Sequence, residues 1–76
     1  MMTVNELFRI WLHHNNPYAE LKVWDLSEGE YIFTTNPPLP GQDAKIVGEM
    51  EAKCFYSYDK ENGKVPMLIV NVGEYK

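Results

Sequence analysis

The chain has 76 residues, of which 45% are hydrophobic and 13% aromatic, and its formal net charge is −4. This length predicts a single domain, 1–76, with a small core, and the apolar content argues against a disordered chain. The acidic balance disfavours nucleic-acid binding, and the longest apolar run, 65–70, is far too short to span a membrane.

Cys54 is the single cysteine, which excludes an internal disulfide and a metal framework built on cysteines. The first residues lack the basic region of a secretory signal and carry Glu6 early. We therefore expect a cytoplasmic protein with no cofactor.

An amphipathic helix is predicted over 3–14. Thr3 and Glu6 have the spacing of a capping box, in which each side chain bonds to the other residue's backbone N–H. Apolar residues then recur at helical spacing: Val4, Leu7, Phe8, Trp11 and Leu12. Pro17 disfavours helical geometry at the residue before it and so ends the helix.

A first β-hairpin follows, with strands over about 20–26 and 30–35. Gly29 can supply the positive φ that a tight turn requires. A two-residue turn pairs Trp24 with Phe33, whereas a three-residue turn changes the pairs. With either turn, Leu21 and Val23 lie on the face opposite Trp24.

The segment 36–41 holds three prolines and is interpreted as an ordered crossover loop that covers a sheet edge or face, with polyproline-type recognition as the alternative. Residues 44–59 alternate between two faces and predict a long strand, bent at Gly48. A short helix from Asp43 to Met50, capped by Asp43, is the alternative.

Asn62-Gly63 favours a type I′ turn and predicts a second hairpin with a defined register. The predicted pairs are Tyr58 with Met67, Tyr56 with Ile69, Phe55 with Val70, and Ser57 with Leu68. Apolar residues thus lie on both faces of this hairpin, although an exposed antiparallel sheet usually has one polar face.

The predicted fold is α+β, with one N-terminal helix packed on a four-stranded antiparallel sheet made of two β-hairpins. The strand order stays open, as does the face that the helix covers. Because one helix covers one face, we expect the opposite face to meet a second copy of the chain or another protein, unless the proline-rich loop hides part of it.

Catalytic, cofactor-binding and metal-binding residues are not predicted. His13 and His14 point about 100° apart on a helix and cannot easily hold one metal. The carboxylates of Asp25 and its neighbours lack the spacing of a calcium loop. Cys54 has no activating neighbour in the sequence and is interpreted as a small packing residue.

The layout resembles small proteins of unknown function that are encoded by phages and prophages. The similarity lies in Thr3-Val4-Asn5-Glu6-Leu7 opening a single helix, in the first strand, 19–25, and in the late hairpin, 55–72. The resemblance implies a mobile-element origin, a helix-plus-sheet fold and no catalytic residue. Small acidic phage proteins include inhibitors of host defence systems such as CRISPR.

The first hypothesis is therefore a non-enzymatic binding module that blocks a host or phage protein sterically. The second is a homo-oligomeric accessory protein whose partner is itself, and the third is a small metal-dependent hydrolase that uses His13, His14 and Asp25. Residue types enriched at interfaces indicate the contact set for the first hypothesis. These residues are Trp24, Tyr31, Tyr56, Tyr58, Met67 and Ile69.

Overall fold

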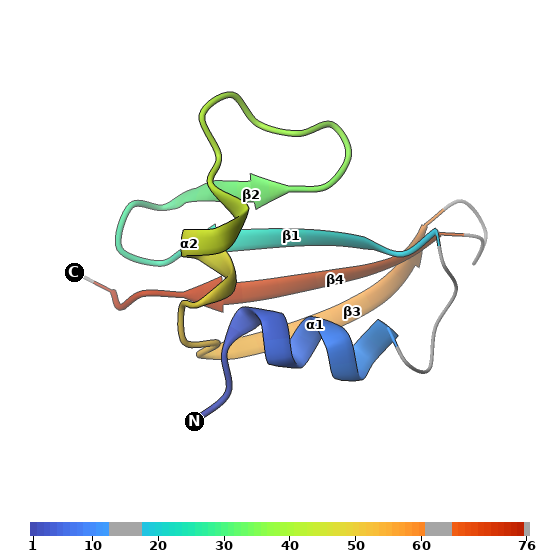
Figure 1. The fold of residues 1–76 in the computed structure, drawn as a ribbon, viewed down its shortest axis with the longest axis horizontal. Coiled ribbons are helices and arrows are strands. Elements are labelled where there is room, and N and C mark those ends of the chain that lie inside the picture. Colours follow the sequence, from blue (N-terminus) through green and yellow to red (C-terminus); the bar gives the residue numbers. More distant parts are fainter. Residues whose placement is uncertain (13–17, 61–64, 76) are drawn as a thin grey trace.

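The computed structural model describes residues 1–12, 18–60 and 65–75, and it shows an α+β fold (Figure 1). In chain order the elements are α1 (Val4–Leu12), β1 (Glu20–Asp25), β2 (Glu30–Thr34), α2 (Ala44–Gly48), β3 (Cys54–Lys60) and β4 (Val65–Val72). Both helices lie on the same face of a four-stranded sheet, and their side chains share one core with that face. Neither helix has the length and apolar character needed to cross a bilayer, among the residues described.

The sheet is mixed, which corrects the predicted antiparallel arrangement. Its strand order is β2-β1-β4-β3, with an antiparallel hairpin at each side and a parallel pair, β1 and β4, in the middle.

The chain leaves the first hairpin at one edge, crosses the helix-bearing face through α2, and enters the second hairpin at the opposite edge (Figure 1). Turn signals specify each hairpin, but they do not specify how two hairpins join.

The predicted capping box is confirmed at the start of α1. The Thr3 N–H donates to Glu6 Oε1 at 3.1 Å, and the Glu6 N–H donates to Thr3 Oγ1 at 3.2 Å. The first of these bonds is the main reason why the pKa of Glu6 lies below its ordinary value. The predicted extension of this helix through His13 and His14 lies outside the described residues.

A second helix replaces the first half of the long strand predicted over 44–59, so the alternative of a short helix is confirmed. The Asp43 side chain caps it by accepting from the N–H groups of Lys45 and Ile46, at 3.1 and 3.2 Å. Two backbone bonds then tie the chain after α2 to the N-terminus, from Val4 to Met50 and from Ala52 to Met2. The segment 44–48 is therefore helical despite its alternating pattern of residues, because the Asp43 cap stabilises the first turn of the helix.

The first hairpin has a longer turn than predicted, because β1 ends at Asp25 and β2 begins at Glu30. Trp24 pairs with Tyr31 and Val23 with Phe33, with an irregularity between the two pairs, so the predicted pairing of Trp24 with Phe33 is wrong. The second hairpin has all four predicted pairs. Its Asn62-Gly63 turn lies outside the described residues.

Strand β4 is buried on both faces. Met67, Leu68 and Val70 are fully buried, and Ile69 is 2% exposed. A strand with a neighbour on each side and cover on each face normally has such a continuous apolar run. The two-sided apolar character of this strand therefore reflects its central position and does not by itself require an external partner.

The proline-rich loop covers the outer edge of β2, as one of its predicted roles requires. The Gln42 side-chain oxygen accepts hydrogen bonds from the backbone N–H groups of Thr34 and Leu39, both at 3.1 Å. The Thr34 hydroxyl donates to the carbonyl of Pro37. The contact at Thr34 satisfies an outward N–H at the end of this edge strand, and the loop lies where another chain could otherwise pair.

Candidate protein interface

All six residues predicted to form an interface come together on the sheet face opposite the helices. Leu21 and Val23 pack in the helix-side core, so the alternating Trp24 points to the other face. Tyr31 lies opposite Trp24, and the pairs Tyr56–Ile69 and Tyr58–Met67 continue the same face across the second hairpin. We call Trp24, Tyr31, Tyr56 and Tyr58 the aromatic face.

The rings of the aromatic face contact one another in two pairs. The centroids of Trp24 and Tyr31 are 4.8 Å apart with an interplanar angle of 83°, an edge-to-face contact. Tyr56 and Tyr58 stack at 6.4 Å with an angle of 19°. The Lys22 ammonium lies 5.4 Å from the centre of the Tyr31 ring. Such contacts stabilise ring orientation and leave broad apolar surfaces for a partner.

The two ring pairs approach each other over the central strands. Burial raises the pKa of Tyr31 above its ordinary value, and the charges of Tyr56 and Tyr58 raise it further. Tyr31 is on the edge strand β2 and the other two tyrosines are on the opposite edge strand β3. Tyr31 and Tyr56 nevertheless line one concave region together with Trp24 and Asn71 of the central strands, so these two rings lie toward each other over β1 and β4.

Exposure divides the six predicted residues into two groups. Tyr56, Tyr58 and Tyr31 are 53%, 46% and 38% exposed, so their rings are available for contact. Met67 and Ile69 are 0% and 2% exposed and form the base on which the aromatic face rests. The sequence indicated these residue types as a contact set, but it left open the face that the helix covers. It also could not separate the accessible residues from the covered ones, because exposure depends on the neighbouring strands.

A concave region of about 310 Å³ lies on this face. It is lined by Trp24, Leu26, Tyr31, Tyr56, Asn71 and Tyr75. Three of these residues were missed from the sequence. The register that pairs Cys54 with Asn71 could have placed Asn71 on this face, and the predicted strand 20–26 puts Leu26 on the same face as Trp24. Tyr75 lies beyond the last strand and gave no signal.

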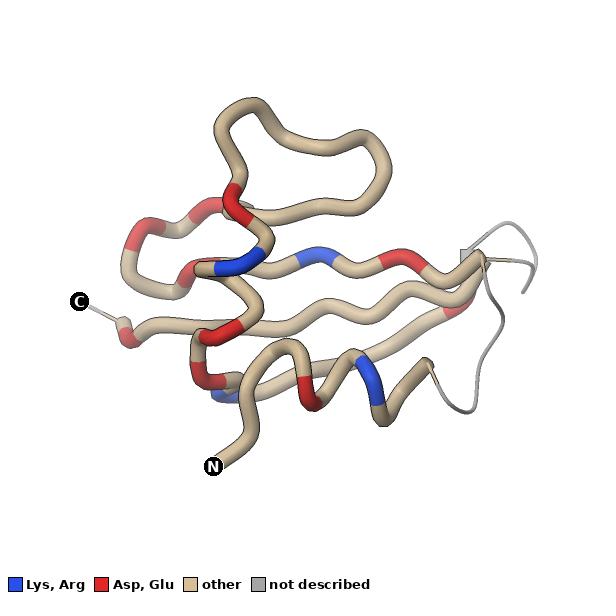
Figure 2. The backbone as a smooth tube through the Cα atoms, in the orientation of Figure 1, with Lys and Arg blue, Asp and Glu red and all other residues tan. Residues whose placement is uncertain are grey.

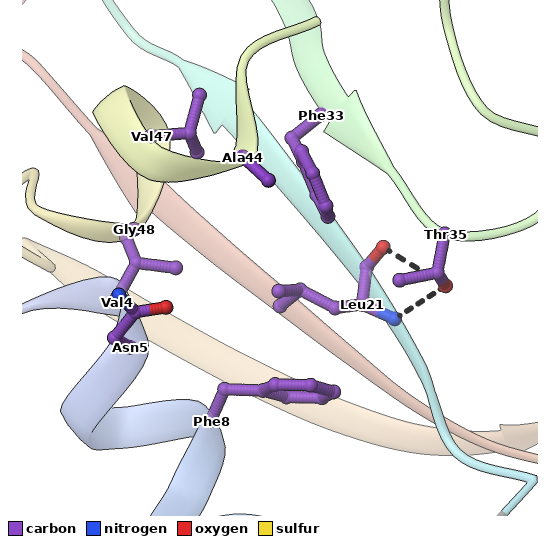
Figure 3. A pocket seen from close by; sticks show the side chains of 9 residues that line it. All are labelled: Val4, Asn5, Phe8, Leu21, Phe33, Thr35, Ala44, Val47 and Gly48. Carbon is purple, nitrogen blue, oxygen red and sulfur yellow. Dashed lines mark hydrogen bonds between the residues drawn. The ribbon is translucent and has the colours of Figure 1, made fainter.

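A second cavity, of about 170 Å³, lies on the other side of the sheet between the two helices (Figure 3). Phe8 and Phe33 point into it from α1 and β2, with Leu21 between them on β1 (Figure 3). Asn5 and Gly48 lie where the helices meet. The cavity is a gap in helix packing, and its polar groups at Leu21 and Thr35 already bond to each other.

The residues considered for catalysis do not form a centre in the described structure. The Asp25 carboxylate accepts from the Ser27 N–H at 2.9 Å and from its hydroxyl at 2.6 Å, so it organises the turn after β1. His13 and His14 lie outside the described residues. Within the described ranges, we find no group of three side chains placed to hold a metal ion.

Cys54 is exposed, which corrects its interpretation as a packing residue. It begins the edge strand β3, and its sulfur accepts a hydrogen bond from the Asn71 side chain at 3.0 Å.

Charged residues are distributed unevenly over the described chain. Carboxylates gather at the end of the sheet where β1 turns into β2, whereas the basic residues lie apart on separate segments (Figure 2).

Comparisons with family models, curated proteins and solved structures found no match.

Proposed function

We propose that this chain is a non-enzymatic protein-binding module that contacts its partner through the aromatic face. The observation that carries the proposal is the gathering of four partly exposed rings from three strands on the sheet face that bears no helix. Trp and Tyr are the residue types most enriched among the residues that dominate binding energy at interfaces.

The geometry also supports a rigid mode of binding. The rings contact one another in pairs and rest on the buried Met67 and Ile69, so little side-chain freedom is lost when a partner covers them. The concave region beside Trp24 can receive a protruding side chain. Binding on this face acts sterically, by occupying a surface that the partner uses for another contact.

The setting proposed for this activity is the cytoplasm of a host cell, with a phage or prophage origin for the chain. The resemblance to small phage proteins supports this setting, and the acidic composition is compatible with it. A host defence protein is the class of target that fits a small steric inhibitor. A phage protein is the alternative target.

The experiment compares capture of partners by the wild-type chain and by variants of the aromatic face. Tyr56→Ala with Tyr58→Ala removes two exposed rings and leaves the helix-side core unchanged, and we expect the captured host protein to be lost. Ile46→Ala is the matched control, because Ile46 is an apolar side chain that is 63% exposed on α2. Equal loss of the captured protein with both variants would refute the proposal.

The homo-oligomeric accessory protein is the second candidate, and a separate observation favours it. Strand β3 is an edge strand whose residues 54–59 are exposed. The hydrolase hypothesis gains no such support, because the Asp25 carboxylate is engaged in the turn after β1.

A further inference from the structure

The two edge strands of the sheet, β2 and β3, differ in how their outward backbone groups are covered. At the β2 edge, Gln42 from the proline-rich loop accepts from the outward N–H of Thr34. At the β3 edge, the order β2-β1-β4-β3 ends and no described strand follows. Natural proteins usually protect an edge with charges, prolines or a covering loop. The segment 54–58 instead contains five consecutive uncharged residues, Cys-Phe-Tyr-Ser-Tyr.

Two hydrogen bonds at the end of β4 show which backbone groups of β3 point outward. The Val72 carbonyl accepts from Leu26, on the β1 side, whereas the Asn71 carbonyl accepts from Lys53, on the β3 side. Backbone groups alternate in direction along a strand, so Asn71 and Ile69 point toward β3. Their partners Cys54 and Tyr56 therefore point inward.

The backbone N–H and C=O groups of Phe55, Ser57 and Asp59 consequently point away from the sheet. These three residues are alternate positions of the strand, which is the spacing of hydrogen-bonded pairs that a second antiparallel strand requires. Phe55 is also 57% exposed, which leaves apolar surface beside this open edge.

We propose that β3 pairs antiparallel with β3 of a second copy, around a two-fold axis at Ser57. This register overlaps the whole strand and forms six backbone hydrogen bonds, two between the serines and two at each Phe55–Asp59 pair. It joins the two sheets into one of eight strands. Tyr56 of each copy then lies opposite Tyr58 of the other, which extends the aromatic face across the seam.

Charge complementarity supports the same arrangement. Asp59 is the acidic residue of β3, and Lys53 precedes the strand at its other end. Within its own chain, the Lys53 ammonium lies 3.3 Å from Glu51 and 3.6 Å from Glu74, which is 84% exposed. In an antiparallel pair centred on Ser57, Asp59 of one copy is diagonal to Lys53 of the other and can replace the exposed Glu74 as a partner of this ammonium. The contact is small, so we expect a reversible dimer with a Kd on the order of 10–100 µM.

Disulfide trapping of the purified full-length chain tests the register. In a Cys54→Ser background, Ser57→Cys places two thiols across the axis with Cα atoms about 5.5 Å apart, within disulfide range. We expect rapid formation of a covalent dimer under mild oxidation. Asp59→Cys in the same background is the control, because its Cα atoms are roughly 14 Å apart in the proposed dimer and it should crosslink at least about tenfold more slowly.

Sedimentation equilibrium tests the association itself. Asp59→Lys should raise the dimer Kd about tenfold, because it replaces two attractive contacts by repulsive ones. Glu30→Lys makes the same change of charge on the opposite edge strand and should alter the Kd less than about twofold.

A wild-type chain that stays monomeric at millimolar concentration would overturn the inference. So would equal crosslinking at positions 57 and 59, or equal weakening by the two lysine variants. Because these measurements use the protein alone, they are independent of whether the aromatic face captures a partner.

Discussion

Gly48 shows how one residue can determine the contact between two elements. Sequence reasoning interpreted it as a bend in a strand, but the structure places it at the end of α2 against α1. A Cβ atom at this position would lie 2.4 Å from the side-chain nitrogen of Asn5. The absence of a side chain therefore permits the close approach of the two helices seen in Figure 3.

Gly48→Ala should accordingly reduce the free energy of unfolding by roughly 1–3 kcal/mol, because the added methyl group displaces Asn5. Alanine favours a helix more than glycine does, so a destabilising result identifies the clash as the dominant effect. Urea denaturation of the single variants and of the double variant Asn5→Ala with Gly48→Ala measures the coupling. The double variant should recover most of the loss, and failure to do so would contradict this account.

Tyr31 provides a pH-dependent test of the aromatic face. Its pKa is raised in the folded state, chiefly by burial and then by Tyr56 and Tyr58. The associated stabilisation is therefore fully present below the ordinary value of about 10 and is lost as the pH rises through the folded-state pKa.

Spectrophotometric titration should show a step in which Tyr31 ionises above the ordinary pKa of tyrosine, and Tyr31→Phe should remove that step. Tyr56→Phe with Tyr58→Phe should lower the pKa of Tyr31, since the neighbouring charges disappear. An unchanged titration of Tyr31 in this double variant would show that the charges of Tyr56 and Tyr58 do not act on Tyr31.

Among the elements, the proline-rich loop stabilises the sheet by covering the β2 edge. One oxygen of Gln42 accepts from two backbone N–H groups, and one of them belongs to Thr34, which is only 5% exposed. Burying an N–H without a hydrogen-bond acceptor costs free energy, so we expect the Gln42 side chain to contribute to the stability of the fold at this edge.

Replacing Gln42 by leucine should destabilise the fold by roughly 1–3 kcal/mol, because two N–H groups lose their acceptor. Gln42→Glu retains an oxygen in the same place and should cost less. Thermal unfolding of both variants measures the difference. If the two lose the same stability, the loop covers the edge by packing and the hydrogen bonds contribute little.

For the whole molecule, the order β2-β1-β4-β3 places the most apolar strand in the centre. Strand β4 contacts a strand on each side, while β3 has one neighbour. This asymmetry determines which parts of the backbone open rarely and which remain accessible to solvent.

Amide hydrogen exchange should follow this arrangement in dilute protein. The N–H groups of Ile69 and Val70 should exchange slowest, and within β3 those of Cys54 and Tyr56 should exchange more slowly than those of Phe55 and Ser57. The contrast within β3 should decrease as the protein concentration rises, if the edge pairs with a second copy. Uniform protection along β3 in dilute solution would contradict the proposed direction of its backbone groups.

Features that depend on neighbouring residues along the chain could be predicted from the amino-acid sequence. The capping box of Thr3 and Glu6 was predictable because its partners are three residues apart. The pairing of Tyr56 with Ile69 was predictable because a turn signal and alternation together define the register. Alternation likewise assigned faces within each hairpin, whereas the relation between the faces of the two hairpins stayed open.

Three features follow from contacts between segments that are distant in the sequence. These features are the joining of the two hairpins, the helix at 44–48, and the burial of Met67 and Ile69. The turn signals in the sequence are local, so they do not predict that β1 pairs with β4 or that this pairing is parallel. The segment 44–48 fits both periods, and Asp43 capping together with the contact at Asn5 selects the helix. Burial of Met67 depends on neighbours brought together by the whole sheet, so a pattern of residue types could indicate its face but not its exposure.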